Sequence, residues 1–360
     1  MEKYTPVIIL VWLLIYPLLI QGKRYVFIFR PLEITRAFRT TLEVIAVILF
    51  TCLWISCKKT NPVKSHCYDL RIVALSPYCN PVWHPDGQFI GFNHTPLKQI
   101  VLEYDERGCL SWVSYVWDLD SSGFWLIDTN GTNMRRVLPY GLGEPDWSSN
   151  GEWIAFEAGA QIFKMQFTGI TFDTTTLTQL TFEGRNFFPS LSPDGKWVAY
   201  SNTIGDTVGV WISPTDGSGI KSYFSSGGQP DWFPDGQRLV YGAGGFWIET
   251  IDHSSKIQIY SDKINRLGEL KVSPDGSKIA FILQASGRGP LQLYLMNADG
   301  SGLRQLTTEG VGEDFSWCPN SKEIVYLSAR FADFSYQNGT LWIIDIETGE
   351  KRQLTFNYPP

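Results

Sequence analysis

The stretch Ser190-Leu191-Ser192-Pro193-Asp194-Gly195-Lys196-Trp197-Val198-Ala199-Tyr200 decides the fold of this chain. It reads as a short strand, a Pro-Asp-Gly turn and a second strand with two-residue alternation. The Asp-Gly pair is typical of a tight hairpin, because glycine adopts a positive φ without steric cost. The unit occurs six times, at intervals of 64, 44, 41, 40 and 45 residues, with turn residues Gly87, Gly151, Gly195, Gly236, Gly276 and Ser321.

Each copy also contains a second hairpin, so a repeat has four strands. In the fifth copy, for example, the strand Leu293–Met296 is followed by a turn at Asp299-Gly300 and a strand at Arg304–Thr307. A period near 40 residues with strand-type patterning is typical of propeller blades. The sequence therefore predicts an all-β, six-bladed β-propeller of four-stranded antiparallel blades over residues 69–358.

These repeats resemble the TolB-type, WD40-like propeller repeat in its Pro-Asp-Gly-Lys form, over roughly residues 70–356. The resemblance implies a periplasmic scaffold that binds protein partners. TolB itself carries an α/β domain before its propeller, and residues 58–68 are too short for one, so the expected function is TolB-like scaffolding rather than a specific role in the Tol system. Similar repeats are found in peptidase and oligogalacturonate lyase propellers, which leaves a peptide or polysaccharide hydrolase or lyase as the alternative.

Composition and motifs argue against nucleic-acid binding, metal binding and catalysis. The chain has 360 residues, 14 Trp, 22 Phe and 16 Tyr, and a net charge of −6. Flat rings suit the packing of twisted sheets, and the negative charge argues against a nucleic-acid partner. The four histidines lack metal-ligand spacing and no Gly-x-Ser-x-Gly elbow occurs. We therefore expect no enzymatic activity, no metal and no cofactor.

Residues 1–57 are expected to be a signal or membrane-anchor segment, followed by a polar tether at 58–68. The apolar run Val44–Ser56 ends at Cys57, and Leu53–Cys57 resembles a bacterial lipobox, in which the cysteine is lipidated. A two-span hairpin, Val7–Ile20 and Leu42–Ile55, is the alternative anchor. Both alternatives place the propeller outside the cytoplasm, at the bacterial cell envelope. The lipobox, with a lysine after its cysteine, favours outer-membrane anchoring facing the periplasm.

The first repeat is longer than the others because of an insertion at 93–123, between its second and third strands. Trp112, Tyr115 and Trp117 lie in it, and we expect an ordered flap that binds a partner. An exported protein permits disulfides. The first hypothesis is a Cys79–Cys109 disulfide, and the second is Cys67–Cys109.

Polar residues recur along the first strand of each repeat, which is the innermost strand of a blade. Two-residue alternation places one set of side chains toward the central channel. Five carboxylates and one lysine would give the mouth beside the loops between blades a negative field. The set serves either to hydrate the channel or to bind a cation or basic peptide. The candidate binding residues are Asn80, Glu144, Asp146, Gln229, Asp231, Glu269 and Asp314.

Overall fold

The computed structural model describes residues 78–204, 207–261, 266–284, 289–328 and 339–356. All of them belong to one compact unit, Cys67–Pro360. The predicted anchor 1–57, the tether 58–68 and the lipidation candidate Cys57 lie outside the described residues. Within the described ranges, no helix has the length and apolar character needed to cross a bilayer.

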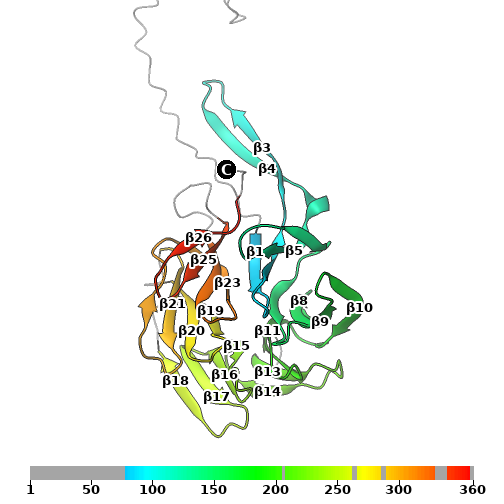
Figure 1. Ribbon diagram of the computed structural model, residues 1–360, viewed down its shortest axis with the longest axis vertical. Helices are drawn as coiled ribbons and strands as arrows, with labels where there is room; N and C mark the ends of the chain where they lie inside the picture. Colours follow the sequence, from blue (N-terminus) through cyan, green and yellow to red (C-terminus); the bar gives the residue numbers. More distant parts are fainter. Residues whose placement is uncertain (1–77, 205–206, 262–265, 285–288, 329–338, 357–360) are drawn as a thin grey trace, which may run out of the picture. The chain divides into compact units, whose positions relative to one another are not determined.

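The described chain forms six four-stranded antiparallel sheets, each of them one blade (Figure 1). Blade 1 consists of β1 (Tyr78–Trp83), β2 (Phe89–His94), β5 (Gly123–Asp128) and β6 (Arg135–Leu138). Blade 2 consists of β7 (Gly143–Trp147), β8 (Trp153–Ala158), β9 (Gln161–Phe167) and β10 (Phe172–Gln179). Blade 3 consists of β11 (Asn186–Leu191), β12 (Trp197–Asn202), β13 (Gly209–Pro214) and β14 (Ser222–Ser225).

Blades 4 to 6 repeat the same order, and the prediction of a six-bladed all-β propeller is confirmed. Blade 4 consists of β15 (Gly228–Trp232), β16 (Arg238–Gly242), β17 (Phe246–Thr250) and β18 (Lys256–Tyr260). Blade 5 consists of β19 (Arg266–Val272), β20 (Lys278–Gln284), β21 (Gln292–Asn297) and β22 (Arg304–Gln305). Blade 6 consists of β23 (Val311–Trp317), β24 (Glu323–Ser328), β25 (Leu341–Asp345) and β26 (Lys351–Gln353).

The turn between the first two strands of each blade has the conformation that the sequence predicts. All six turn residues have a φ between 59° and 77°, including the serine in the last blade. The Asp or Asn before each of them accepts a hydrogen bond through Oδ1 from the backbone N–H two residues further on. This Asx geometry explains why Asp or Asn recurs immediately before the turn residue.

The innermost strands β1, β7, β11, β15, β19 and β23 lie side by side in sequence order, and β23 returns to β1 to close the ring. A hydrophobic cluster joins blades 6 and 1, with Phe92 and Ile127 on one side and Val325 and Leu341 on the other. Five further clusters fill the remaining interfaces between neighbouring blades. The predicted role of aromatic side chains between blades is thus confirmed.

Each innermost strand contains an irregularity in its register with the second strand. In the first four blades the residue at this bulge has a left-handed φ of 46° to 54°: Asn80, Glu144, Phe188 and Gln229. A bulge bends the strand and redirects side chains. The bulge therefore interrupts the two-residue alternation along these strands.

The insertion of the first blade forms its own two-stranded sheet, β3 (Leu97–Tyr104) and β4 (Leu110–Trp117), followed by the 3₁₀ turn η1 (Leu119–Ser121). It joins β2 to β5, as the length of the first interval predicted. Figure 1 shows the hairpin extending away from the blades. No residue of β3 or β4 belongs to the hydrophobic clusters found among the described residues.

Candidate functional site in the central channel

Side chains of the six innermost strands form two layers in the channel. The first layer lies nearer the loops that connect blades and contains Asn80, Glu144, Phe188, Gln229, Glu269 and Asp314. The second layer lies two residues further along each strand and contains Val82, Asp146, Ser190, Asp231, Lys271 and Ser316. All seven candidate residues from the sequence analysis thus belong to one of these layers.

The acceptor side chains of both layers connect neighbouring blades. A carboxylate or hydroxyl of one blade accepts a hydrogen bond from a backbone N–H of the next blade. Four such bonds lie in the second layer: Trp83 N to Ser316 Oγ (3.0 Å), Leu191 N to Asp146 Oδ2 (2.7 Å), Trp232 N to Ser190 Oγ (3.3 Å) and Val272 N to Asp231 Oδ2 (2.6 Å).

The first layer contains three bonds of the same kind. They join Asn80 N to Asp314 Oδ2 (3.1 Å), Phe188 N to Glu144 Oε2 (2.5 Å) and Phe315 N to Glu269 Oε2 (3.3 Å). The innermost strands of adjacent blades share no sheet, so their inward N–H groups need acceptors from side chains. The polar residues of the channel therefore satisfy the backbone of the ring.

Lys271 supplies a cation within the channel. Its Nζ lies 3.2 Å from Glu269 Oε1, and both side chains are largely buried. The carboxylates of Glu269, Asp146 and Asp231 raise the pKa of the Lys271 ammonium against the opposing effect of burial, so this group stays protonated. The predicted cation-attracting field is thus partly neutralised by the chain's own ammonium.

Burial changes the titration of the channel carboxylates. It raises the pKa of Glu144, of Asp146 and of Glu269 to about 7. Burial also raises the pKa of Asp231. Lys271 opposes these shifts by favouring the ionised carboxylates. The charge of the channel therefore changes around neutral pH.

The channel widens into a cavity of about 310 Å³ at the end where the turns between the first and second strands lie. Its floor is the second layer, including Asp146, Asp231 and Lys271. Its walls and rim are mostly indole and proline rings: Trp83, Trp147, Trp232, Trp317, Pro85, Pro193, Pro234, Pro274 and Pro319. The sequence analysis placed the mouth at the opposite end, where Glu144, Gln229 and Glu269 line a space of only about 10 Å³.

The four tryptophans of the cavity were not predicted as site residues. The sequence analysis assigned nearly every tryptophan to the core, and these four are indeed mostly buried. Trp232 Nε1 donates to Ser190 O and Trp317 Nε1 donates to Lys271 O, both at 3.1 Å. The repeat pattern could have indicated their shared location, because each of the four tryptophans is the last residue of an innermost strand.

The candidate residues of the insertion lie on the β3–β4 hairpin, away from the channel. Trp112 is 62% exposed, whereas Tyr115 and Trp117 are half-buried and their rings stack at a centroid distance of 6.4 Å. Cys109 is disulfide-bonded, and Cys79 carries a thiol. The Cys79–Cys109 hypothesis is therefore wrong, and the Cys67–Cys109 hypothesis concerns a residue outside the described ones.

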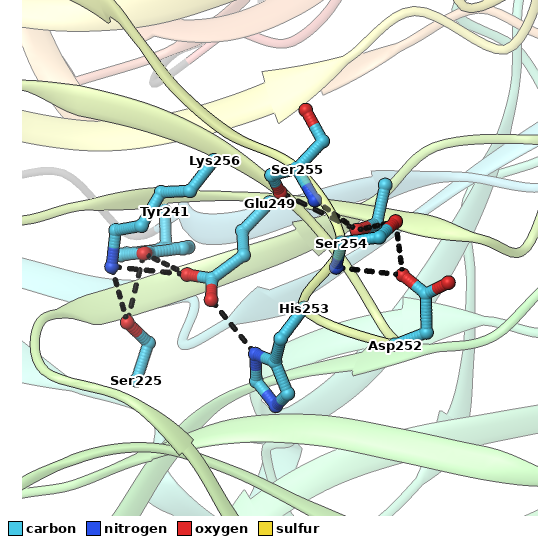
Figure 2. A network of polar contacts seen from close by, with 9 residues as sticks. Ser225, Tyr241, Glu249, Asp252, His253, Ser254, Ser255 and Lys256 are labelled. Carbon is cyan, nitrogen blue, oxygen red and sulfur yellow. Dashed lines mark hydrogen bonds and ion pairs between the residues drawn. The ribbon is translucent and has the colours of Figure 1, made fainter.

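A second polar cluster lies outside the channel, between blades 3 and 4 (Figure 2). The buried carboxylate of Glu249 accepts from Tyr241 OH (2.5 Å), and contacts His253 Nδ1 (2.8 Å) and Lys256 Nζ (3.1 Å). Lys256 Nζ also lies 3.0 Å from Ser225 Oγ. Sequence analysis missed this cluster, because only the folded chain brings Ser225 and Tyr241 to the hairpin that carries Glu249, His253 and Lys256.

The Glu249 cluster is suited to joining blades rather than to nucleophilic chemistry. Hydrogen bonds from Tyr241, His253 and Lys256 lower the pKa of Glu249 to about 2 although burial opposes this shift. Tyr241 and Glu249 in turn raise the pKa of Lys256, although burial acts in the opposite direction. An ammonium held protonated cannot act as the base that would activate Ser225.

Comparisons with known proteins support the fold. No protein-family model matches this chain. An uncharacterized protein of Agrobacterium fabrum is 24% identical over 223 residues, or 53% of this chain and 74% of that protein. The Tol-Pal system protein TolB of Francisella tularensis is 24% identical over 224 residues, or 58% of this chain and 51% of that protein.

A solved structure shows the same architecture. TolB from Acinetobacter baumannii superposes with a TM-score of 0.53 and 19% identity, covering 64% of this chain and 59% of that one. The chain is a TolB-like β-propeller. The match to the TolB of Francisella tularensis spans about half of that relative's length. The likeness of this TolB-like propeller to the solved structure concerns the fold.

The described parts of this TolB-like propeller hold no group of three or more His, Cys, Asp or Glu arranged to bind a metal ion. His84 packs between Phe89 and Trp147, and its Nε2 lies 3.2 Å from Gly151 O. The imidazole therefore joins the turns of blades 1 and 2.

Proposed function

We propose that this TolB-like propeller is a non-enzymatic scaffold that binds a protein or peptide partner in the cavity of its channel. The observation that carries the proposal is the combination of apolar walls and a charged floor in one cavity of about 310 Å³. Binding sites commonly combine a mostly apolar surface with a few placed polar groups. Indole and proline rings fit an apolar peptide side chain, and the floor offers partners for its backbone or for a polar terminus.

The channel residues have two roles in this proposal. Asp146 and Asp231 lie in the floor, where they contact the ligand, while Asn80, Glu144, Gln229, Glu269 and Asp314 lie behind it and add a negative field. When all groups are ionised, the two layers together carry five negative carboxylates and one positive ammonium. A basic group on the partner is attracted by this field.

The geometry favours binding over catalysis. Both carboxylates of the cavity floor accept hydrogen bonds from backbone amides of the next blade, at 2.7 and 2.6 Å. A general acid or base has to exchange a proton with a substrate at such a distance. A hydrolase or lyase, the alternative from the sequence analysis, would have to release these carboxylates from the ring.

The proposed location is the bacterial cell envelope, outside the cytoplasm. The disulfide of Cys109 supports it, because disulfides persist in oxidising compartments. Lipidation at Cys57 with outer-membrane anchoring remains a prediction, as does the transmembrane alternative. The intact mass of the mature protein from membranes tests both: acylation predicts cleavage before Cys57 with added acyl mass, whereas a retained amino terminus contradicts it.

Peptide selection tests the binding site directly. A random peptide library is selected on the wild-type propeller, and affinities are measured by calorimetry. Ser149→Trp/Pro274→Trp places two large side chains at exposed positions of the cavity rim. Ser218→Trp, in an exposed turn between the third and fourth strands of blade 3, is the matched control. We expect the double variant to weaken binding at least tenfold and the control to leave it unchanged.

Two outcomes contradict the proposal. Peptides that bind the double variant and the wild type equally do not use the cavity. Failure to select any peptide that competes for the cavity removes the basis for a peptide partner. The double variant Glu144→Gln/Glu269→Gln tests the field separately: weaker binding of lysine-containing peptides is expected, with binding of neutral peptides unchanged.

A further inference from the structure

The floor of the channel cavity contains a carboxylate oxygen that the propeller leaves without a donor. Asp146 lines the cavity, and its Oδ2 accepts from the backbone N–H of Leu191 at 2.7 Å, whereas its Oδ1 has no donor among the described residues. In Asp231, by contrast, Oδ1 accepts from Ser190 Oγ at 2.9 Å and Oδ2 accepts from Val272 N at 2.6 Å. Asp146 is therefore the floor carboxylate with an oxygen left for a ligand.

The floor also contains an ammonium with donors to spare. Lys271 lines both the cavity and the narrow space behind the floor, and its Nζ lies 3.2 Å from Glu269 Oε1. An ammonium has three N–H donors. In the part of the chain that the structure describes, no other side chain forms an ion pair or hydrogen bond with this Nζ. Lys271 can therefore donate to an acceptor in the cavity while it keeps its contact with Glu269.

Asp146 and Lys271 approach the channel from opposite sides. Asp146 belongs to β7 and Lys271 to β19, and these strands are three blades apart in the ring of six. The Asp146 carboxylate contributes to the raised pKa of the Lys271 ammonium, although these two described side chains form no ion pair with each other. A ligand between them must therefore offer a cation on the side of blade 2 and an acceptor on the side of blade 5.

The floor beside Asp146 is apolar. Val82, on the neighbouring strand β1, is the aliphatic member of the second layer, and it lines the cavity together with Trp83 and Trp147. All three residues are more than nine-tenths buried, so the surface that they present to a ligand is already ordered by packing. An apolar side chain that rests there lies close to the free oxygen of Asp146.

The cavity ends at its floor, which favours a chain terminus over a chain that passes through the channel. The space behind the floor, lined by Glu144, Gln229 and Glu269, is about 10 Å³, which holds about one water molecule. A carboxyl terminus would bring a second negative charge close to Asp146, and neighbouring like charges disfavour the ionised forms. An amino terminus brings a positive charge there instead.

The first residue of a peptide offers the three groups that this floor can bind. Its α-ammonium and its side chain are attached to the same carbon atom, and its carbonyl oxygen is on the next carbon. A lysine side chain differs, because its ammonium stands at the end of a four-carbon stem with no acceptor beside it. It would bring a second ammonium toward Lys271 and leave the donors of that residue unused.

We propose that the partner inserts a free amino terminus into the cavity, where its α-ammonium binds Asp146 Oδ1 and its first carbonyl oxygen accepts from Lys271 Nζ. An apolar first side chain packs over Val82. The inference rests on the proposed function, because it assigns one end of a peptide to the same cavity. It also defines the class of partner: a chain with an unmodified amino terminus and an apolar first residue. A partner with an acylated amino terminus lacks the charge and is excluded.

Removal of the amino group from bound peptides tests the inference. Short random peptides with free amino termini are selected on the wild-type propeller, and those that Ser149→Trp/Pro274→Trp binds at least tenfold more weakly are kept. Each is then made in an N-acetylated form and in a des-amino form, which loses the charge without gaining bulk. Calorimetry at pH 7, where an α-amino group is mostly protonated, measures the affinities. We expect both forms to bind roughly tenfold more weakly or worse.

The outcomes separate this inference from the proposed function. Peptides that need the open cavity but bind equally well without the amino group overturn the inference and leave the proposed function intact. A loss confined to the acetylated form shows a steric effect, which also overturns it. The same holds if binding survives acetylation but is lost when a lysine of the peptide is replaced by norleucine. If no peptide needs the open cavity, the proposed function itself fails.

Asp146→Asn tests the residue that is assigned to the amino terminus. The variant keeps a carbonyl oxygen for the N–H of Leu191 and replaces the free oxygen by an NH₂ group, which cannot accept from an ammonium. We expect it to bind free-amine peptides at least tenfold more weakly and the des-amino forms as the wild type does. Glu350→Gln, which removes an exposed carboxylate outside the channel, is the control for net charge. Equal weakening of both peptide forms in Asp146→Asn overturns the assignment, with thermal unfolding showing that the variant is folded.

Discussion

Asp146 in blade 2 accepts, through Oδ2, a 2.7 Å hydrogen bond from the backbone N–H of Leu191 in blade 3, 45 residues further along the chain. The carboxylate takes the place of the neighbouring strand that an innermost strand lacks on that side. Similar bonds occur from blade 3 to 4, 4 to 5 and 6 to 1 in the same layer. A residue chosen as a binding candidate thus also maintains the ring.

Removing this acceptor is expected to destabilise the propeller. Asp146→Ala leaves the N–H of Leu191 without its acceptor at a mostly buried site, which costs about 1–3 kcal/mol of unfolding free energy. Asp146→Asn keeps a carbonyl oxygen in place and should cost less than half as much. Urea denaturation measures both, with exposed Glu350→Ala as the control. Equal stability of the alanine and asparagine variants would show that the bond contributes little.

Stability should fall as the pH rises toward neutrality and beyond. The pKa values of Glu144, Asp146 and Glu269 are raised to about 7, so the folded state binds these protons more tightly than the unfolded chain. The protonated carboxyl groups therefore add to the free energy of unfolding. This contribution is fully present below about pH 4 and is lost as the pH passes 7. We expect a loss on the order of 2–3 kcal/mol for each of the three carboxyl groups between pH 5 and pH 8.

The triple variant Glu144→Gln/Asp146→Asn/Glu269→Gln should show a flatter profile, since its amides do not titrate. Denaturation midpoints at pH 5, 6, 7 and 8 compare it with the wild type. A wild-type profile that rises across this range would contradict the raised pKa values.

The sequence predicted the blades better than the channel. Asp194-Gly195 determines a turn locally, and the six copies recur at a blade's period, so the architecture followed from short-range chemistry. The left-handed φ of Glu144 is different, because a bulge depends on pairing with a distant part of the second strand. Whether Lys271 neutralises carboxylates of other blades depends on ring closure, which no local pattern encodes.

Replacing Lys271 should destabilise the protein most strongly at high pH. Lys271→Met removes the ammonium that favours ionisation of Asp146, Asp231 and Glu269. Uncompensated buried charge costs about 3–5 kcal/mol. The cost should appear in full at pH 8 and shrink at pH 5, where these carboxylates become protonated. Lys196→Met, at an exposed surface pair with Asp194, should change stability by less than about 0.5 kcal/mol at either pH.

The outer Glu249 cluster should respond to pH in the opposite direction. The pKa of Glu249 is lowered to about 2, so its contribution is present above about pH 4.5 and is lost as the pH falls toward 2. Glu249→Gln is expected to cost about 2–3 kcal/mol at pH 7 and much less near pH 2. Unfolding at both pH values measures the difference. A cost independent of pH would show that the charge of Glu249 is not what holds Lys256 and His253.

Gly195→Ala tests the turn from which the fold was predicted. Gly195 has a φ of 70°, and a Cβ added there would meet nothing within 4 Å. Any cost must therefore come from backbone conformation rather than from a clash, and a left-handed alanine costs about 1–2 kcal/mol. At Gly151 the added Cβ would lie 2.5 Å from His84 Nε2, so Gly151→Ala adds a steric cost to the same conformational one. We therefore expect Gly151→Ala to lower the melting temperature more than Gly195→Ala does. An equal loss at both sites would contradict the packing of His84 against the turn of blade 2.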